Sequence, residues 1–249
     1  MLMSVIEGAL SVPAYPELVG KRVLITGVTR RAGIDVARAF AERKGRVILQ
    51  FAEASAAMHA VAEVVAPDAL ETRVYGPVAP GADAARFAKS AAQAFGGLDA
   101  VINLVPLEPA ELDPAATMED VERQIAAQLE LPLLVSRIAA NRMSVTWTQG
   151  LILNVATLAG RPAAAGHGAG RGARRAFASL AKSTLVDLTR AQAEEWAGRG
   201  IRFNAIAPET ALGELGPRLS GEADVAALAL YLASRHGKSL SGCVFEAAP

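Results

Sequence analysis

Short apolar runs alternate along the chain with longer segments in which apolar residues recur every three or four positions. A short apolar run is typical of a buried strand in a parallel sheet, and the longer period marks one face of a helix. The runs predict strands at 22–26, 47–49, 70–75, 100–102, 151–153, 201–206 and 244–245. The periodic segments predict helices at 33–43, 54–65, 84–95, 118–143, 177–197 and 225–233. This alternation predicts an α/β fold with a parallel, doubly wound sheet covered by helices on both faces.

The first 20 residues do not join this pattern, because Pro13 and Pro16 interrupt them. We therefore expect an N-terminal arm over 1–20 and one domain over 21–249. A chain of 249 residues, 52% of them apolar, is long enough to bury one large α/β core.

Composition narrows the class of protein. The 25 basic and 25 acidic residues give a formal net charge of zero, so nothing global favours nucleic acid or an anionic membrane surface. The single cysteine, Cys243, excludes an internal disulfide framework. No run is long enough to span a membrane, and no signal peptide is apparent. We expect a cytoplasmic protein. His59, His167 and His236 lack neighbouring ligands at metal spacing, so no metal is expected.

The first predicted strand ends in a glycine-containing loop. Ile25-Thr26-Gly27 closes the apolar run, a basic segment follows, and Gly33-Ile34 opens a helical pattern. Glycines let the backbone approach a phosphate, and the N-terminus of a helix presents free N–H groups with a partial positive charge. An ordinary strand-to-helix turn is the alternative interpretation of this stretch alone.

Several motifs resemble those of the short-chain dehydrogenase/reductase family, over about residues 18–248. Two of them are specific in combination: Lys182-Ser183-Thr184-Leu185-Val186-Asp187-Leu188-Thr189-Arg190, and Gly200-Ile201-Arg202-Phe203-Asn204-Ala205-Ile206-Ala207-Pro208. The strand motifs Ile25-Thr26-Gly27, Asp99-Ala100-Val101-Ile102-Asn103 and Leu151-Ile152-Leu153-Asn154 agree with them. The resemblance implies a Rossmann-type sheet of about seven strands and binding of a nicotinamide dinucleotide. It also implies dimers or tetramers that pack through two long helices, here around Ala126 and Leu185.

The resemblance further implies hydride transfer between a carbonyl and an alcohol. In the family a tyrosine moves the proton, a lysine four residues later lowers its pKa, a serine polarises the substrate oxygen, and an asparagine orders water. Two groups four apart share a helix face, so a cation there can depress the pKa of a phenol. Lys182 matches the lysine, but Ala178 stands at the tyrosine position. Thr157 replaces the serine and keeps a hydroxyl, and Gln128 replaces the asparagine.

The segment between Thr157 and Lys182 is longer than the family's usual gap. It holds Gly166, Gly168, Gly170 and Gly172, with Arg171, Arg174 and Arg175. We expect a flexible inserted loop here. The arginines are expected to be solvated, with a phosphate contact as the alternative.

The cofactor positions are partly kept. Matching positions are Gly27, Arg30, Arg31, Gly33, Ile34, Asn103, Lys182 and Pro208, and Arg30 favours the phosphate of NADP. Asp35 replaces a glycine, and its carboxylate would repel a pyrophosphate. Pro77 replaces an aspartate that meets the adenine, and Phe51 stands where NAD-binding members carry an aspartate. Glu53 lies where a ribose-binding acid could stand, although a solvated glutamate is the favoured interpretation.

Three functions remain open. The favoured hypothesis is a catalytically impaired family member, a pseudoenzyme that acts as a structural or regulatory subunit of a homo-oligomer or of a hetero-oligomer with an active homologue. The alternative is an active NADP(H)-dependent oxidoreductase that reduces a ketone or 3-oxoacyl substrate. The third is a sensor that binds NAD or NADP without turnover.

Overall fold

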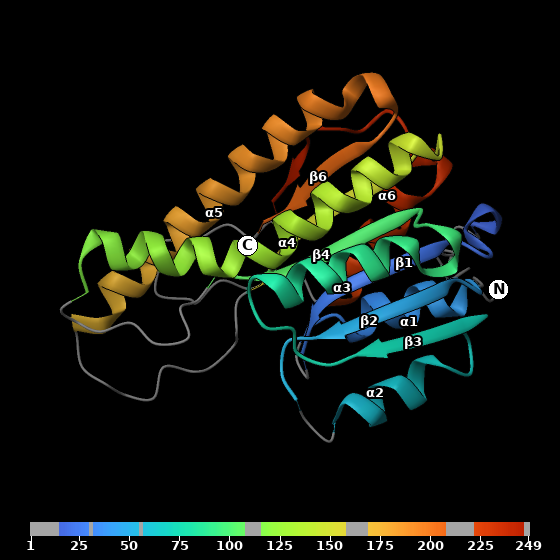
Figure 1. Ribbon diagram of the computed structural model, residues 1–249, viewed down its shortest axis with the longest axis horizontal. Helices are drawn as coiled ribbons and strands as arrows, with labels where there is room; N and C mark the ends of the chain where they lie inside the picture. The colour runs from blue at the N-terminus through green and yellow to red at the C-terminus, as the bar shows by residue number, and fades with distance from the viewer. Residues whose placement is uncertain are drawn as a thin grey trace, which may run out of the picture.

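A single parallel sheet of seven strands forms the centre of the computed structural model, which describes residues 15–29, 32–54, 57–107, 116–157, 169–207 and 222–246 (Figure 1). The strand order is β3-β2-β1-β4-β5-β6-β7. The strands are β1 (Arg22–Val28), β2 (Arg46–Phe51), β3 (Glu71–Tyr75), β4 (Ala100–Pro106), β5 (Leu151–Thr157), β6 (Arg202–Ile206) and β7 (Val244–Phe245). The predicted fold class, a doubly wound α/β sheet of about seven strands, is confirmed.

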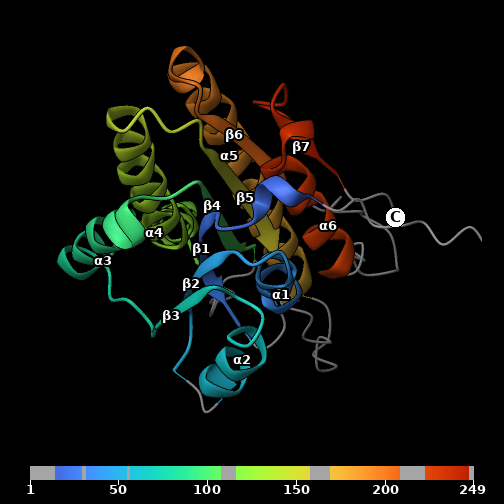
Figure 2. The ribbon, with the colours of Figure 1, turned by 90° about the vertical axis from the view of Figure 1, so that its right-hand side faces the viewer.

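Two layers of helices cover the sheet (Figure 2). One layer holds α1 (Ile34–Glu42), α2 (Ala57–Val65) and α6 (Glu222–Ala233), and the other holds α3 (Ala82–Gln93), α4 (Met118–Val145) and α5 (Ala169–Trp196). Alternate residues of the central strands belong to two hydrophobic cores, one under each layer of helices. Val23 and Ile25 pack under the first layer, and Leu24 packs under the second. Both faces are therefore buried, as a parallel sheet requires.

A buried polar network joins the central strands to the long helices. The Nδ2 group of Asn103 on β4 donates to Asn154 Oδ1 on β5 and to Ser136 Oγ on α4, each at 2.9 Å. Thr26 Oγ1 on β1 donates to Asn103 Oδ1 at 2.9 Å. Asn154 Nδ2 in turn donates to Thr189 Oγ1 on α5 at 2.9 Å. Buried polar groups are costly unless paired, so this network fixes how α4 and α5 sit on the sheet.

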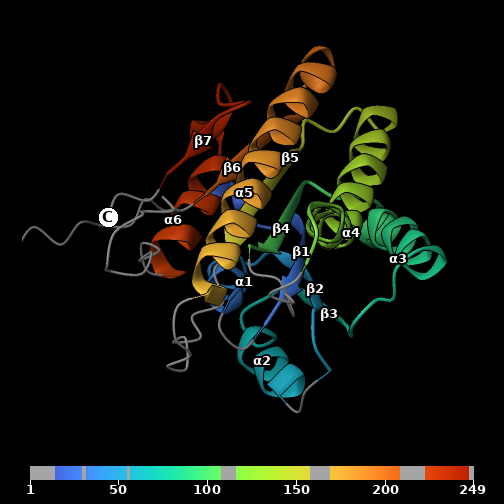
Figure 3. The same ribbon diagram turned by 90° about the vertical axis from the view of Figure 1, so that its left-hand side faces the viewer.

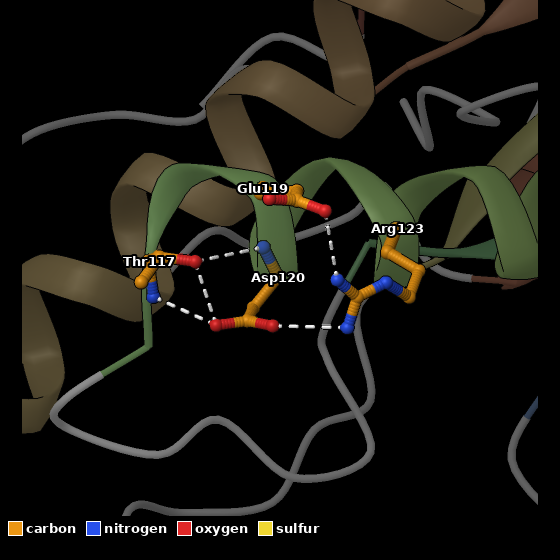
Figure 4. Close-up of polar contacts among 4 residues, drawn as sticks. All are labelled: Thr117, Glu119, Asp120 and Arg123. Atoms are coloured by element: carbon orange, nitrogen blue, oxygen red, sulfur yellow. Dashed lines mark hydrogen bonds and ion pairs between the residues drawn. The ribbon is translucent and has the colours of Figure 1, made fainter.

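The N-terminus of α4 is closed by a capping box (Figure 4). Thr117 Oγ1 accepts the Asp120 N–H at 3.2 Å, and Asp120 Oδ2 accepts the Thr117 N–H at 3.0 Å. Asp120 and Glu119 also pair with Arg123. Hydrogen bonds from Thr117 lower the pKa of Asp120, and acidic charge suits the positive end of a helix.

Helices α4 and α5 run on the same side of the sheet, with α3 beyond α4 (Figure 3). Helix α4 changes direction along its length (Figure 1), and Pro132 lies inside it. Proline has no N–H to donate and its ring crowds the preceding turn, which accounts for the bend.

The prediction of a loop between Thr157 and Lys182 is wrong over part of its length. Residues 169–176 belong to α5, and residues 158–168 lie outside the described ranges. Two glycines in the first turn of α5 weaken a helix by about 1 kcal/mol each, but alanine and arginine around them favour it. A helix that is already anchored by packing also gains one hydrogen bond for each added residue.

The end of the expected N-terminal arm contacts the domain. Pro16–Leu18 form a 3₁₀ turn, and Tyr15 and Leu18 are buried in the core under α6. Residues 1–14 lie outside the described ranges. None of the helices in the described ranges combines the length and apolar character that a membrane span requires.

Replacement of Asn103 by alanine is expected to destabilise the protein by about 2–3 kcal/mol, because it leaves buried partners on three elements without their hydrogen bonds. Urea unfolding followed by circular dichroism measures this loss. Asn141→Ala is the matched control, since Asn141 is an exposed residue of α4, and it should change stability by less than about 0.5 kcal/mol. Equal effects of the two substitutions would show that the network does not anchor the fold.

Candidate functional site

The glycine loop is packed tightly against β4. Gly27 and Gly33 have φ angles of 73° and 94°, which favour glycine. A Cβ atom built on Gly27 would overlap the carbonyl oxygen of Leu104, and one on Gly33 would overlap the Leu104 side chain. Leu104 itself is buried. The conformation of the loop is therefore fixed by contact with Leu104 of this chain.

The buried side chain of Gln50, near the end of β2, completes this packing. Its Oε1 accepts the Gly27 N–H at 2.9 Å. Its Nε2 donates to the carbonyl oxygens of Phe51 at 2.6 Å and Gly76 at 3.4 Å. One carboxamide thus joins the glycine loop, the end of β2 and the segment after β3. In the implied family site these three segments surround the adenosine half of the dinucleotide.

Helix α1 carries its own negative charge at its N-terminus. Gly33 is the N-cap and provides no side-chain cap, and Asp35 lies in the first turn. Asp35 Oδ1 lies 3.3 Å from Arg38 Nη1. A carboxylate is stabilised at this end of a helix and opposes binding of a second anion there. Ile34 begins α1 beside it.

Three of the predicted catalytic positions lie near the carboxyl ends of β4 and β5: Thr157, Ala178 and Gln128. Thr157 ends β5 opposite Pro106 of β4, and its carbonyl oxygen accepts the Leu107 N–H at 2.8 Å. Ala178 of α5 is buried in an apolar cluster with Ala156 of β5 and with Ile125 and Leu129 of α4. Gln128 lies between these two α4 residues in the sequence. The cluster also contains Val105, Leu107, Phe177, Ala181, Leu185 and Ala207. The position one turn before Lys182 thus contributes only a methyl group.

Lys182 is largely buried and makes an ion pair. Its Nζ donates to Glu246 Oε1 at 2.9 Å, just after β7, and 15% of the Lys182 side chain is exposed against 56% for Glu246. Ser179, Ser183, Asp187 and Arg190 line a hollow beside this pair. The ammonium group therefore has an anionic partner within the chain.

The three tyrosines of the chain lie elsewhere. Tyr15 and Tyr231 both contact the ring of His236, with centroids 6.0 and 6.2 Å away. Tyr75 lies on β3, toward the opposite edge of the sheet from β7, and packs edge-on against Phe87 at 5.3 Å. In the described part of the chain, a phenol is not found beside Lys182.

The remaining predicted site residues lie in different surroundings. Asn103 serves the buried network described above. Phe51 is buried in the core under α1, whereas Glu53 and Pro77 are exposed. Arg30, Arg31 and Pro208 lie outside the described residues, as do the side chains of Arg171, Arg174 and Arg175. Among the described residues, no group of three or more His, Cys, Asp or Glu could hold a metal ion.

Sequence reasoning missed Gln50, Leu104 and Glu246. A polar residue inside the otherwise apolar run 47–51 was the available signal for Gln50. Leu104 follows Asn103 in an apolar run and gives no sign of its contact with two distant glycines. Glu246 pairs with a residue 64 positions away, which no local pattern reveals.

Comparison with known proteins decides the family. A family model described as short chain dehydrogenase matches residues 21–224. The chain belongs to the short-chain dehydrogenase family. An uncharacterized oxidoreductase of Thermotoga maritima is 30% identical over 195 residues, which are 78% of this chain and 73% of that protein. Galactitol 2-dehydrogenase (L-tagatose-forming) of Cereibacter sphaeroides is 29% identical, covering 90% and 92% of the two chains. The crystal structure of a short-chain type dehydrogenase/reductase from Mycobacterium marinum, 24% identical, superposes with a TM-score of 0.74 over 95% of this chain and 97% of that one.

Members of the short-chain dehydrogenase family generally bind NAD or NADP, and the described residues fit such a dinucleotide poorly. The Gly27 N–H already has an acceptor in Gln50. Leu104 packs on both glycines of the loop, and Asp35 adds negative charge at the helix N-terminus. The Gly27 N–H thus already has an acceptor from the chain, and the start of α1 already carries a carboxylate.

Gln50→Ala is expected to destabilise the protein by about 1–3 kcal/mol, because the Gly27 N–H loses its acceptor in a buried setting. Urea unfolding measures the loss, and amide hydrogen exchange at Gly27 should become faster. Gln93→Ala, at the exposed end of α3, is the control and should change neither quantity. Unchanged Gly27 exchange in Gln50→Ala would show that this hydrogen bond contributes nothing.

Proposed function

We propose that this chain is a catalytically impaired short-chain dehydrogenase homologue that acts as a structural or regulatory subunit, in an oligomer of itself or with an active homologue. The observation that carries the proposal is Ala178. It stands one helical turn before Lys182 and is buried among apolar side chains. Reduction of a carbonyl needs a proton at the substrate oxygen, and a methyl group cannot donate one. Loss of a positioned proton donor typically costs about 10²–10⁴ in rate.

The surroundings of Lys182 support the same proposal. In the family mechanism the lysine's positive charge lowers the pKa of the tyrosine. Here the Lys182 ammonium donates to Glu246 at 2.9 Å, which offsets its charge. A tyrosine at 178 would consequently meet a partly neutralised cation.

The long helices support the structural role. Family members commonly form homo-oligomers, and the resemblance assigns that contact to two long helices. Helices α4 and α5 each have 28 residues, and α4 begins with a complete capping box. Leu180 of α5 is 37% exposed on the side away from the core. The chain thus keeps the two long helices through which family oligomers pack, although its site residues differ.

The second candidate is an active NADP(H)-dependent oxidoreductase for a ketone or 3-oxoacyl substrate. Thr157 favours it, because its hydroxyl group stands at the end of β5 and could polarise a carbonyl oxygen. Two relatives are named as an oxidoreductase and a dehydrogenase, which is compatible with this alternative.

Titration of the purified protein with NADPH and NADH separates these functions. We expect no saturable binding up to about millimolar cofactor, because Asp35 and Gln50 oppose it. Calorimetry measures binding directly, and quenching of Trp147 or Trp196 fluorescence gives an independent readout. Micromolar binding with turnover of a carbonyl substrate would establish the oxidoreductase instead, and micromolar binding without turnover would establish a dinucleotide sensor.

Ala178→Tyr tests the site from the other direction. We expect it to show no turnover with NADPH and a panel of ketones, since the cofactor site differs as well. The larger ring should also cost about 1–3 kcal/mol of stability by overpacking the apolar cluster. Ala178→Phe is the matched control for packing without the hydroxyl group. Turnover that appears in Ala178→Tyr and not in Ala178→Phe would show that only the proton donor is missing.

A further inference from the structure

A cavity of about 520 Å³ opens at the amino ends of the strands, at the opposite end of the sheet from the glycine loop. It is lined by residues that precede or begin β1, β4, β5 and β6 and by the turn after α6. Four basic residues line it, Lys21, Arg202, Arg235 and Lys238, together with two acidic residues, Glu17 and Asp99. Its volume falls within the range of small-molecule sites.

Both carboxylates are already engaged by neighbouring cations. Asp99 accepts hydrogen bonds from Arg22 Nε at 2.7 Å and Arg22 Nη2 at 3.1 Å, and it lies 3.5 Å from Lys21 Nζ. Burial works to raise the pKa of Asp99, but the hydrogen bonds from Arg22 outweigh it and hold that pKa below its usual value. Glu17 accepts the Arg235 N–H at 3.0 Å. Neither carboxylate is left to neutralise the remaining cations.

Arg202 is the best-placed of these cations. Its Nη1 donates to the carbonyl oxygens of Leu232 at 2.8 Å and Gly237 at 2.7 Å. Within the described ranges it has no carboxylate partner, and its Nε and Nη2 groups make no hydrogen bond. Burial lowers the pKa of Arg202, because it removes water from around the charged guanidinium.

Neutral donors and a second cation stand at the same cavity. Lys238 is exposed and forms no ion pair with a described residue. Ser241 Oγ accepts the Phe203 N–H at 3.3 Å, which leaves its own hydrogen to donate. Thr148 and Gln149 add a hydroxyl and an amide. The planar fork of an arginine matches the oxygens of a phosphate, and a lysine adds a point charge.

We propose that this cavity binds the phosphate group of a small phosphorylated metabolite, with Arg202 and Lys238 as its cationic partners and Ser241 as a neutral donor. The site lies apart from the glycine loop and does not depend on the function proposed above. A nucleic acid is not the expected ligand, because the chain as a whole carries no net charge.

Calorimetric titration of the full chain with inorganic phosphate and with glycerol 3-phosphate tests the proposal, with sodium chloride added to match ionic strength. We expect saturable binding that Lys238→Ala weakens about five- to tenfold, the loss of one charged contact. Lys89→Ala is the matched control, because Lys89 is an exposed lysine of α3 that does not line the cavity, and this variant should bind as the wild type does. Tighter binding of glycerol 3-phosphate than of phosphate identifies a metabolite site, and equal binding identifies a site for free phosphate.

Arg202→Lys gives a second test, since it keeps the charge and loses the fork. We expect binding to fall by at least about tenfold. Arg202 also holds the carbonyl oxygens at the end of α6, so a thermal melt must show that this variant is folded; if it is not, Lys238→Glu takes its place and should abolish binding. If the wild type binds neither phosphate compound at millimolar concentration, or if Lys238→Ala and Lys89→Ala bind equally, Arg202 only caps α6 and the proposal is wrong.

Discussion

The side-chain amide of Asn103 is the contact on which the rest of the structure depends. It is fully buried, and it bonds in one place to β1, β5 and α4. An unpaired amide there would cost several times what each bond contributes, so the three elements can take only the register that satisfies it. Because that register also aligns Pro106 with Thr157, the network determines which residues meet at the carboxyl end of the sheet.

The sequence predicts this architecture well because the strands are nearly all apolar and the helices keep a clear period. It predicts the beginning of α5 poorly, since glycines at 170 and 172 indicate a loop, while anchoring of the helix by Phe177 and Leu185 decides otherwise. The candidate site is predictable only as a set of positions. Lys182 and Thr157 follow from motif spacing, but the pairing of Lys182 with Glu246 depends on how the last strand meets α5.

The changed residues of the site share a physical consequence. Gln50 supplies an acceptor to Gly27, Asp35 supplies charge to the start of α1, and Glu246 supplies a counter-ion to Lys182. A binding site usually leaves such donors and charges for its ligand, at some cost to the stability of the free protein. Here side chains of the chain satisfy them, so the unliganded fold does not carry that cost.

The two ends of the sheet therefore differ in electrostatic character. At the carboxyl end, the Gly27 N–H, the Ala32 N–H and the Lys182 ammonium each have an acceptor within the chain. At the amino end, Arg202 is partly buried, and the partners it has among the described residues are carbonyl oxygens. Lys238 has no counter-ion in the same part of the chain. Uncompensated positive charge in a partly desolvated cavity is costly, and an anionic ligand lowers that cost by pairing with the charge. These cations without a counter-ion thus lie at the amino end of the sheet, opposite the carboxyl end where the family carries out its chemistry.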